Sequence, residues 1–201
     1  EVTFLGGQKS AGRNWNDISP FLPLDEDIVI EKPDPEIISE KADYALLSLP
    51  NGLSSFIAPE LLKRNVRIID LSADYRYRSL DQWKKYYSTE VNNLDRSDYQ
   101  ECETAVYGLP EWNSDEIKGA QLVSCPGCFP TASLLPLMPF IKQGLVEHDG
   151  IIIDAKTGTS GGGRNPKEHL LLSECSESIS PYGVIGHKHT SEIEQQATEV
   201  A

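Results

Sequence analysis

The chain has 201 residues, and 39% of them are hydrophobic, which is enough to bury a core and too many for an intrinsically disordered protein. Its 31 Asp and Glu against 18 Lys and Arg give a formal charge of −13, which disfavours nucleic-acid phosphates and anionic membranes as partners. The sequence has neither a long apolar run nor the zones of a signal peptide. These features predict a soluble cytoplasmic protein with no nucleic-acid or membrane partner.

The cysteines and the two ends of the chain give two further expectations. Four cysteines at irregular spacing are too few for a disulfide framework, so we expect thiols. The first residues read as a strand with no preceding turn, and the last as a helix with no closing signal. We therefore expect a fragment of a longer protein.

Strand and helix patterns alternate in the first part of the chain. Residues 44–49 form a continuous apolar run ended by Pro-Asn-Gly, as expected of a strand buried on both faces of a parallel sheet. A helical pattern over 54–63 and a strand over 66–72 follow, and this order predicts a doubly wound α/β unit. Further strands are expected at 1–5, 28–30 and 121–124, and further helices at 34–43, 80–87 and 131–143. Residues 80–105 otherwise read as a connection.

The character of the sequence changes at residue 150. An Ile-Ile-Ile run begins a segment that we assign to a second domain containing sheet, followed by a glycine-rich loop over 158–163. A histidine-bearing turn then leads into a helix over 191–201, whose N-cap is expected at Thr190 or Ser191.

Cys128 is the leading candidate for a nucleophile. It follows Pro126 and Gly127 where a strand ends and a helix begins, so free N–H groups and the positive end of the helix dipole should face its sulfur. Such a setting favours a thiolate, and the same N–H groups could stabilise an oxyanion on an attacked carbonyl. A structural turn cysteine is an equally good interpretation of the motif alone.

Cys125 and Cys128 also form a C-x-x-C motif, which raises two other chemistries. A zinc site would need two more ligands, but there is no second C-x-x-C and the histidines lie far along the chain. A thioredoxin-like disulfide normally opens a different βαβ context. We therefore predict no metal and rank the redox interpretation low.

Three other groups are candidate site residues. His187 and His189 alternate just before the last helix, where one imidazole could serve as acid/base for Cys128, although a surface pair is the simpler interpretation. Arg76 lies just beyond a strand end and could hold a carboxylate or acyl phosphate, or be a solvated charge. The glycine-rich loop ends in Arg164, which suits phosphate, but this loop is not a G-x-G-x-x-G fingerprint.

Several segments together are much more specific than each alone. In order, they are Leu49-Pro-Asn-Gly, Asp70-Leu-Ser-Ala-Asp-Tyr-Arg, Val106-Tyr-Gly-Leu-Pro-Glu, Pro126-Gly-Cys-Phe-Pro-Thr-Ala, Gly158-Thr-Ser-Gly-Gly-Gly-Arg and Gly186-His-Lys-His-Thr-Ser-Glu-Ile-Glu-Gln. From about residue 1 to 196 they resemble the N-acetyl-γ-glutamyl-phosphate reductase family of arginine biosynthesis, relatives of aspartate-semialdehyde dehydrogenase.

The resemblance implies a fold and a reaction. The expected fold class is α/β, with an NADP-binding Rossmann-type domain over 1–127 and the start of an α+β catalytic and dimerisation domain over 128–201, both incomplete here. The family reduces N-acetylglutamyl 5-phosphate with NADPH to the semialdehyde and phosphate, through a thioester on the cysteine. A small acyl phosphate partner and a homo-oligomer are therefore also implied.

The resemblance also assigns roles to residues of this chain. Cys128 matches the nucleophile of the P-G-C-[YF]-P-T signature, and His187 and His189 match the H-[RK]-H acid/base pair. Arg76 and Arg164 are implied as substrate-binding residues. Ser160, Gly161, Gly162 and Gly163 match the S-G-x-G-R loop beside the nicotinamide.

The chain departs from the family pattern in several places. Cys125 stands where the family usually has Asn, and Asn51 where it has His, which puts local hydrogen bonds in doubt. The G-x-[ST]-G-Y-x-G loop that holds the pyrophosphate of NADPH, and the strands that complete the catalytic sheet, are not in this sequence. Three alternatives stay open: the aminoadipate-phosphate reductase of lysine biosynthesis, a non-catalytic module that kept the fold, and a cysteine hydrolase.

Overall fold

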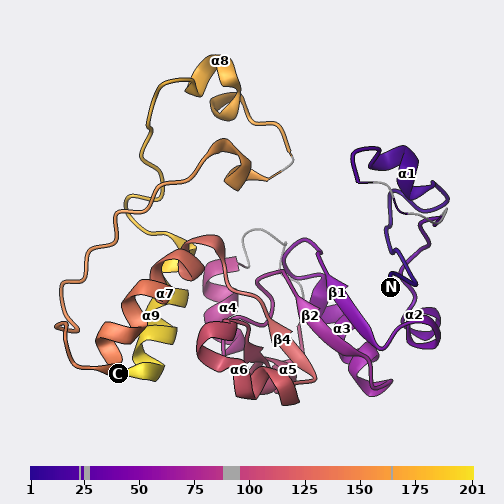
Figure 1. Cartoon of the computed structure of the whole chain (residues 1–201), viewed down its shortest axis with the longest axis horizontal. Coiled ribbons are helices and arrows are strands. Elements are labelled where there is room, and N and C mark those ends of the chain that lie inside the picture. Colours follow the sequence, from indigo (N-terminus) through magenta and orange to yellow (C-terminus); the bar gives the residue numbers. More distant parts are fainter. Residues whose placement is uncertain (23, 25–27, 88–95, 164) are drawn as a thin grey trace. The chain divides into compact units, whose positions relative to one another are not determined.

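The computed structural model describes residues 1–201 except 23, 25–27, 88–95 and 164 (Figure 1). The chain divides into two compact units, Glu1–Cys125 and Pro126–Ala201. Unit 1 contains helices α1 (Trp15–Ile18), α2 (Pro35–Lys41), α3 (Ser54–Lys63), α4 (Leu80–Tyr87), α5 (Tyr99–Thr104) and α6 (Pro110–Gly119), and strands β1 (Tyr44–Leu47), β2 (Arg67–Asp70), β3 (Val106–Tyr107) and β4 (Leu122–Ser124). Unit 2 contains α7 (Cys128–Lys142), the 3₁₀ helices η1 (Thr159–Gly162) and η2 (Glu168–Leu170), α8 (Leu172–Cys175) and α9 (Lys188–Val200).

Unit 1 is built on a parallel four-stranded sheet in the order β1-β2-β4-β3. Tyr44 lies opposite Arg67 and Ile68 opposite Leu122, so β2 and β4 are neighbours although 51 residues lie between the end of β2 and the start of β4. Such a long connection between parallel strands needs a crossover, and α4, α5 and α6 lie within it. The predicted α/β class and parallel sheet are confirmed.

The core of unit 1 lies between the sheet and the helices that connect its strands. Ile57, Ala58 and Leu61 share one face of α3 and are buried there, as the 3.6-residue period of a helix requires. On α4, Trp83 and Tyr87 lie one turn apart and stack with their ring centroids 6.0 Å apart. This packing explains why both helices could be predicted from their periodicity.

Some expected elements do not form as predicted. β1 alternates between buried and exposed residues, with Leu46 68% exposed, so the prediction of a strand buried on both faces is wrong: only the face toward α3 is covered. Residues 1–5 and 28–30 do not form the expected strands: the described chain there has only isolated bridges, from Gly6 to Glu31 and from Asn14 to Val29. Residues 151–153 are extended but unpaired and exposed, because no strand among the described residues lies beside them to complete a ladder.

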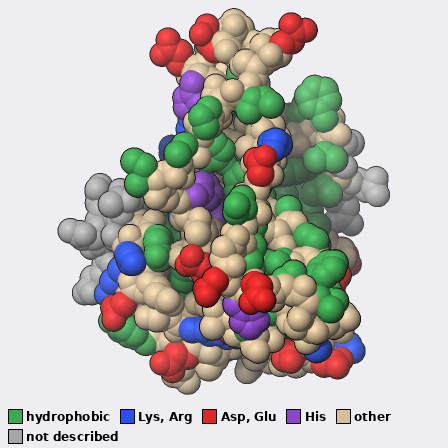
Figure 2. Space-filling view, turned by 90° about the vertical axis from the view of Figure 1, so that its left-hand side faces the viewer, with side chains coloured by type: hydrophobic (Ala, Val, Ile, Leu, Met, Phe, Trp, Pro, Cys, Tyr) green, Lys and Arg blue, Asp and Glu red, His purple; other side chains and the backbone are tan. Residues whose placement is uncertain are grey.

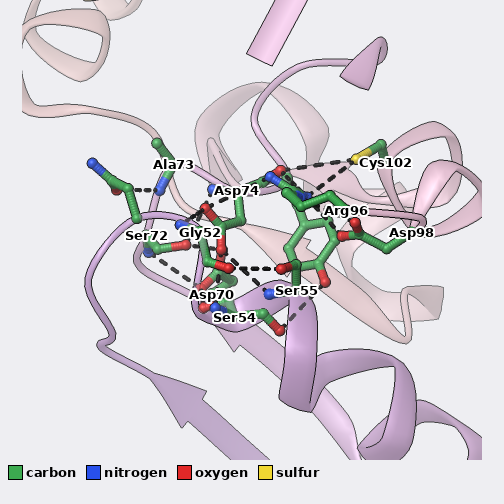
Figure 3. A network of polar contacts seen from close by, with 12 residues as sticks. Gly52, Ser54, Ser55, Asp70, Ser72, Ala73, Asp74, Arg96, Asp98 and Cys102 are labelled. Carbon is green, nitrogen blue, oxygen red and sulfur yellow. Dashed lines mark hydrogen bonds and ion pairs between the residues drawn. The ribbon is translucent and has the colours of Figure 1, made fainter. Parts of the chain in front are cut away.

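A buried polar network lies at the carboxyl end of β2 (Figure 3). The Asp74 carboxylate accepts the backbone N–H groups of Gly52, Ser54 and Ser55, at the start of α3. These N–H groups have no acceptor within the helix, so a carboxylate at this point replaces the missing hydrogen bonds and meets the positive end of the helix dipole. Asp74 thus joins the loop after β2 to the start of α3.

Arg96 supplies the positive charge of this network, and it is only 3% exposed (Figure 3). Its guanidinium donates to both carboxylate oxygens of Asp98, at 3.0 and 2.6 Å, and to the carbonyl oxygen of Asp74 at 3.0 Å. Its Cζ lies 4.2 Å from the ring centroid of Trp83. The network therefore ties the polar strand ends to the aromatic core.

The carboxyl group of Asp74 is still costly to ionise. Burial raises its pKa from 3.8 to about 6, against the opposing effect of Arg96. The folded protein keeps this proton to a higher pH than the unfolded chain does. The protonated Asp74 side chain therefore contributes fully to the stability of the fold below about pH 4, and this contribution is lost as the pH rises through about 6.

Replacing Asp74 by Asn tests this titration. We expect the free energy of unfolding of the wild-type protein to fall between pH 4 and pH 6. This fall should exceed the fall in Asp74→Asn by on the order of 3 kcal/mol. Urea unfolding followed by tryptophan fluorescence measures it, since all three tryptophans lie in unit 1. Asp115→Asn, at an exposed position, is the control. The same pH dependence in wild type and Asp74→Asn would contradict the assignment.

Candidate active site

Cys128 is the first residue of α7 and its side chain is exposed. The helix begins three residues earlier than the sequence predicts, and Pro130 lies in its first turn. A proline is compatible with this position because the first N–H groups of a helix have no intrahelical acceptor. The structure therefore has Cys128 at the start of a helix, as predicted. The role of Cys128 as a nucleophile stays a prediction.

The turn before α7 offers fewer free N–H groups than the sequence suggests. Pro126 and Pro130 have none, and Thr131 donates its N–H to the carbonyl oxygen of Gly127 at 2.9 Å. The N–H of Gly127 donates to the Glu192 carboxylate, also at 2.9 Å. The N–H groups of Cys128 and Phe129 remain in the first turn, which is the number an oxyanion site commonly uses.

The histidine pair lies at the start of α9. This helix begins at Lys188, and its N-cap is His187 rather than Thr190 or Ser191, so that prediction is wrong. The Nδ1 atom of His187 accepts the N–H of His189 at 3.1 Å, a bond that requires Nδ1 to be unprotonated. In the neutral ring the proton is then on Nε2.

Both imidazoles pack against the residue that follows Cys128. The ring of Phe129 meets the rings of His187 and His189 edge-on, with centroids 5.5 and 5.9 Å apart, and the two imidazole centroids are 4.8 Å apart. Tyr182 packs on His187 at 5.5 Å. Figure 2 shows one side of the molecule, on which histidine side chains appear among apolar and acidic ones. The structure thus places both predicted histidines next to the start of α7.

The environment of these rings changes their titration. Burial, and then the charge of Lys188, lowers the pKa of His187, so its imidazole is neutral at pH 7. Burial, and then the negative charge of a Cys128 thiolate, raises the pKa of Tyr182.

A cleft of about 640 Å³ opens beside the histidine pair, between α7, α9 and residues 148–155 and 182–183. This volume lies within the usual range for small-molecule sites. Its lining includes Phe129, Ser133, Tyr182, His187, His189 and Thr190.

Arg76 lies in unit 1 and contacts the ends of two strands. Its Nε donates to the carbonyl oxygen of Cys125 at 2.8 Å, and its Nη2 to that of Leu71 at 3.2 Å. Burial, and then the charge of Asp70, raises the pKa of the Cys125 thiol, which makes this cysteine a poor nucleophile. Asn51, the other departure from the family pattern, accepts the N–H of Ala73 at 3.1 Å.

The glycine-rich loop forms η1 in unit 2. Gly163 has φ +83°, which favours glycine, whereas Gly161 and Gly162 have negative φ and lie against the side chains of Thr157 and Leu170. Among the described residues, no hydrogen bond, ion pair or ring contact joins Ser160, Gly161, Gly162 or Gly163 to Cys128 or the histidines. Arg164 lies outside the described residues, so its predicted role stays a prediction.

The described part of unit 1 offers no open helix start for a dinucleotide pyrophosphate at α3. A dinucleotide usually places its pyrophosphate on the free N–H groups at the start of a helix that follows a sheet strand. In α3 the Asp74 carboxylate occupies this position. The start of α3 is therefore already occupied by a carboxylate of the protein itself.

Three residues of this site were not found by sequence reasoning. Glu192 is fully buried, Tyr182 packs on His187, and Gly183 has φ +61° with a Cβ position only 3.0 Å from the His187 ring. The only sequence signal was the Tyr-Gly pair, which is a common turn composition. The contact between Glu192 and Gly127 could not be seen in the sequence, because it depends on how α7 and α9 pack.

Comparison with known proteins matches both parts of the chain. Residues 1–120 match the semialdehyde dehydrogenase NAD binding domain, and residues 128–201 match the semialdehyde dehydrogenase dimerisation domain. The chain belongs to the semialdehyde dehydrogenase family. Unit 1 of this family member is thus similar to a nicotinamide-nucleotide domain, and unit 2 to a domain named for dimerisation.

The relatives found are much longer than the chain. Two proteins named N-acetyl-gamma-glutamyl-phosphate reductase, from Prochlorococcus marinus strains MIT 9211 and MIT 9313, are 68% and 67% identical over the whole chain. The chain covers 56% of the length of each. Aspartate semialdehyde dehydrogenase II from Vibrio cholerae has 19% identity and a TM-score of 0.45, over 70% of this chain and 37% of that one.

Two further properties concern the part of the chain that the structure describes. No group of three or more His, Cys, Asp or Glu in it is placed to hold a metal ion. No helix in it has the length and apolar character needed to cross a membrane.

Gly183→Ala tests whether the Tyr182–Gly183 turn sets the position of His187. A methyl group at this residue would strain the backbone and press on the imidazole, so we expect the NMR signal of the His187 ring to shift and its titration to change. Gly186→Ala is the control, since a Cβ there meets nothing within 4 Å. Unchanged His187 titration in Gly183→Ala would refute this role.

Proposed function

We propose that the protein is an NADPH-dependent N-acetyl-γ-glutamyl-phosphate reductase that forms a thioester on Cys128. The carrying observation is an exposed cysteine at the first position of α7, with two imidazoles packed on the next residue. The printed names of the relatives supply the substrate. These names also favour this substrate over the aminoadipate phosphate of the lysine pathway.

In this proposal the chain's own residues perform the acyl transfer. The Cys128 thiolate attacks the acyl carbon, and the N–H groups of Cys128 and Phe129 stabilise the oxyanion that forms. Phosphate then leaves, and the acyl group remains bound to sulfur. Arg76 and Arg164 are proposed to bind the anionic groups of the substrate.

His187 is proposed as the proton carrier of the pair. It is less buried than His189, its imidazole is neutral at pH 7, and its Nε2 carries the proton when Nδ1 accepts from His189. A neutral imidazole with a proton on Nε2 can donate to the oxygen of the thiohemiacetal as it forms, and can take the proton back as that intermediate collapses to the aldehyde and the thiolate. His189 then fixes the orientation of the His187 ring.

The NADP-binding Rossmann-type domain is proposed to span 1–127, and the catalytic and dimerisation domain 128–201. NADPH supplies the hydride that reduces the thioester. Ser160, Gly161, Gly162 and Gly163 are proposed to lie beside the nicotinamide, where glycines allow the backbone to approach closely. In the family pattern the pyrophosphate is held by a G-x-[ST]-G-Y-x-G loop, a motif that this sequence does not contain. The match to a dimerisation domain supports a homo-oligomer, and a cytoplasmic location fits this chemistry.

The phosphate-dependent oxidation of N-acetylglutamate semialdehyde by NADP tests the function. In the full-length polypeptide we expect Cys128→Ser to reduce the rate by about 10³-fold or more, because the hydroxyl is a much weaker nucleophile. Cys125→Ser, which changes the half-buried thiol, should keep most of the activity.

Other outcomes would identify the alternatives. Equal activity of Cys128→Ser and wild type would exclude the thioester mechanism. No activity in the wild-type protein would favour the non-catalytic module, and acyl-phosphate breakdown without NADP would favour a hydrolase.

A further inference from the structure

We propose that Glu192 is a positioning residue for Cys128, and that its buried carboxylate fixes the turn from which the thiol projects. The inference rests on the proposed function in one respect, the role of Cys128 as nucleophile. Glu192 lies on α9 and is 0% exposed, and its Oε1 accepts the N–H of Gly127 at 2.9 Å. Gly127 is the N-cap of α7 and has no cap from a side chain of its own segment.

Packing alone does not explain a glutamate at this position. α7 and α9 lie against each other, and α7 buries Pro130, Leu134, Met138 and Ile141. Burying a carboxylate is expensive unless hydrogen bonds compensate it, and an apolar residue of the same size would fill the space without this cost. A carboxylate that is buried despite this cost is consistent with a need for a hydrogen-bond acceptor at this position, which an apolar side chain would not supply.

The spacing on α9 links this carboxylate to the histidine turn. His189, Glu192 and Gln196 are the buried residues of α9, three and four positions apart, so they share one face of the helix. His189 in turn gives its N–H to His187. One helix face therefore holds both His189, whose backbone N–H bonds to His187, and the acceptor for the turn that precedes Cys128.

The hydrogen bond from Gly127 controls where the first turn of α7 points. Pro126 has no N–H, so Gly127 is the first donor after β4 and Cys125 that can tie this turn to α9. Gly127 has extended backbone angles, φ −64° and ψ 160°, and a rotation there would swing the N–H groups of Cys128 and Phe129 together. A displacement of about 1 Å at a reacting group can cost about 100-fold in rate.

Two substitutions of equal size separate hydrogen bonding from packing. Glu192→Gln keeps an oxygen that can accept from Gly127, whereas Glu192→Met fills the same space without a comparable acceptor. Glu199→Gln and Glu199→Met, at an exposed position on the same helix and outside the lining of the cleft, are the matched controls. In the full-length polypeptide, kcat and KM are measured for the reductase reaction. The rate of Cys128 alkylation by iodoacetamide is measured by peptide mass spectrometry, with Cys175 as the internal reference.

We expect Glu192→Met to lower kcat about tenfold or more at nearly unchanged KM, and to change the alkylation rate of Cys128 but not that of Cys175. Glu192→Gln should restore most of both. Wild-type behaviour of Glu192→Met, or equal impairment of the two variants, would overturn the proposal. If Glu192→Met fails to fold, Glu192→Gln decides alone: wild-type Cys128 reactivity supports the role and altered reactivity refutes it. Alkylation needs no turnover, so a wild-type protein without reductase activity would sink the proposed function and still leave this comparison decisive.

Discussion

The pairing of α7 with α9 is the constraint on which the candidate site depends. The two helices are separated by 45 residues of sequence, yet their first turns meet, because Gly127 at the start of α7 donates to Glu192 on α9. The ring of Phe129 then packs on both imidazoles. This packing arrangement therefore holds the histidine pair against the residue that follows the exposed Cys128.

The polar side chains at the strand ends of unit 1 have a structural role. Asp74 closes the start of α3, and Arg96 compensates the buried carboxylates while it lies over Trp83. A helix start that elsewhere would bind an anionic ligand is used here to hold the loop after β2. The start of α3 is therefore closed to an anionic ligand by the carboxylate of Asp74.

The parts of the fold that could be predicted are those with a strong local period. α3 and α4 have the predicted bounds, and β1, β2 and β4 lie within the predicted runs, because each buries a regular stripe against the core. Residues 151–153 have the composition of a strand, but a strand also needs a neighbour, and composition cannot supply one. The glycine-rich loop could be located from sequence, whereas its distance from Cys128 could not.

The candidate site also contains residues that could be predicted from the sequence and residues that could not. Cys128 and the histidine pair were recognisable from their motifs, since reactive residues at a helix start have a short-range signature. Glu192 was not, because Glu192 and Glu194 look equivalent in the sequence and only packing determines which one is buried. The N-cap role of His187 was also missed, since Ser, Thr, Asp and Asn are the residues usually expected there.

The thioester itself is the most direct object to measure. With N-acetylglutamate semialdehyde and NADP but no phosphate, the aldehyde is oxidised on the enzyme and the acyl group has no acceptor except water. We predict that peptide mass spectrometry of the quenched full-length protein finds one N-acetylglutamyl group, removable by hydroxylamine, on the peptide containing Cys128 and specifically on that sulfur. Reductase activity accompanied by an acyl group on Cys125, or by no covalent adduct under these conditions, would contradict the account.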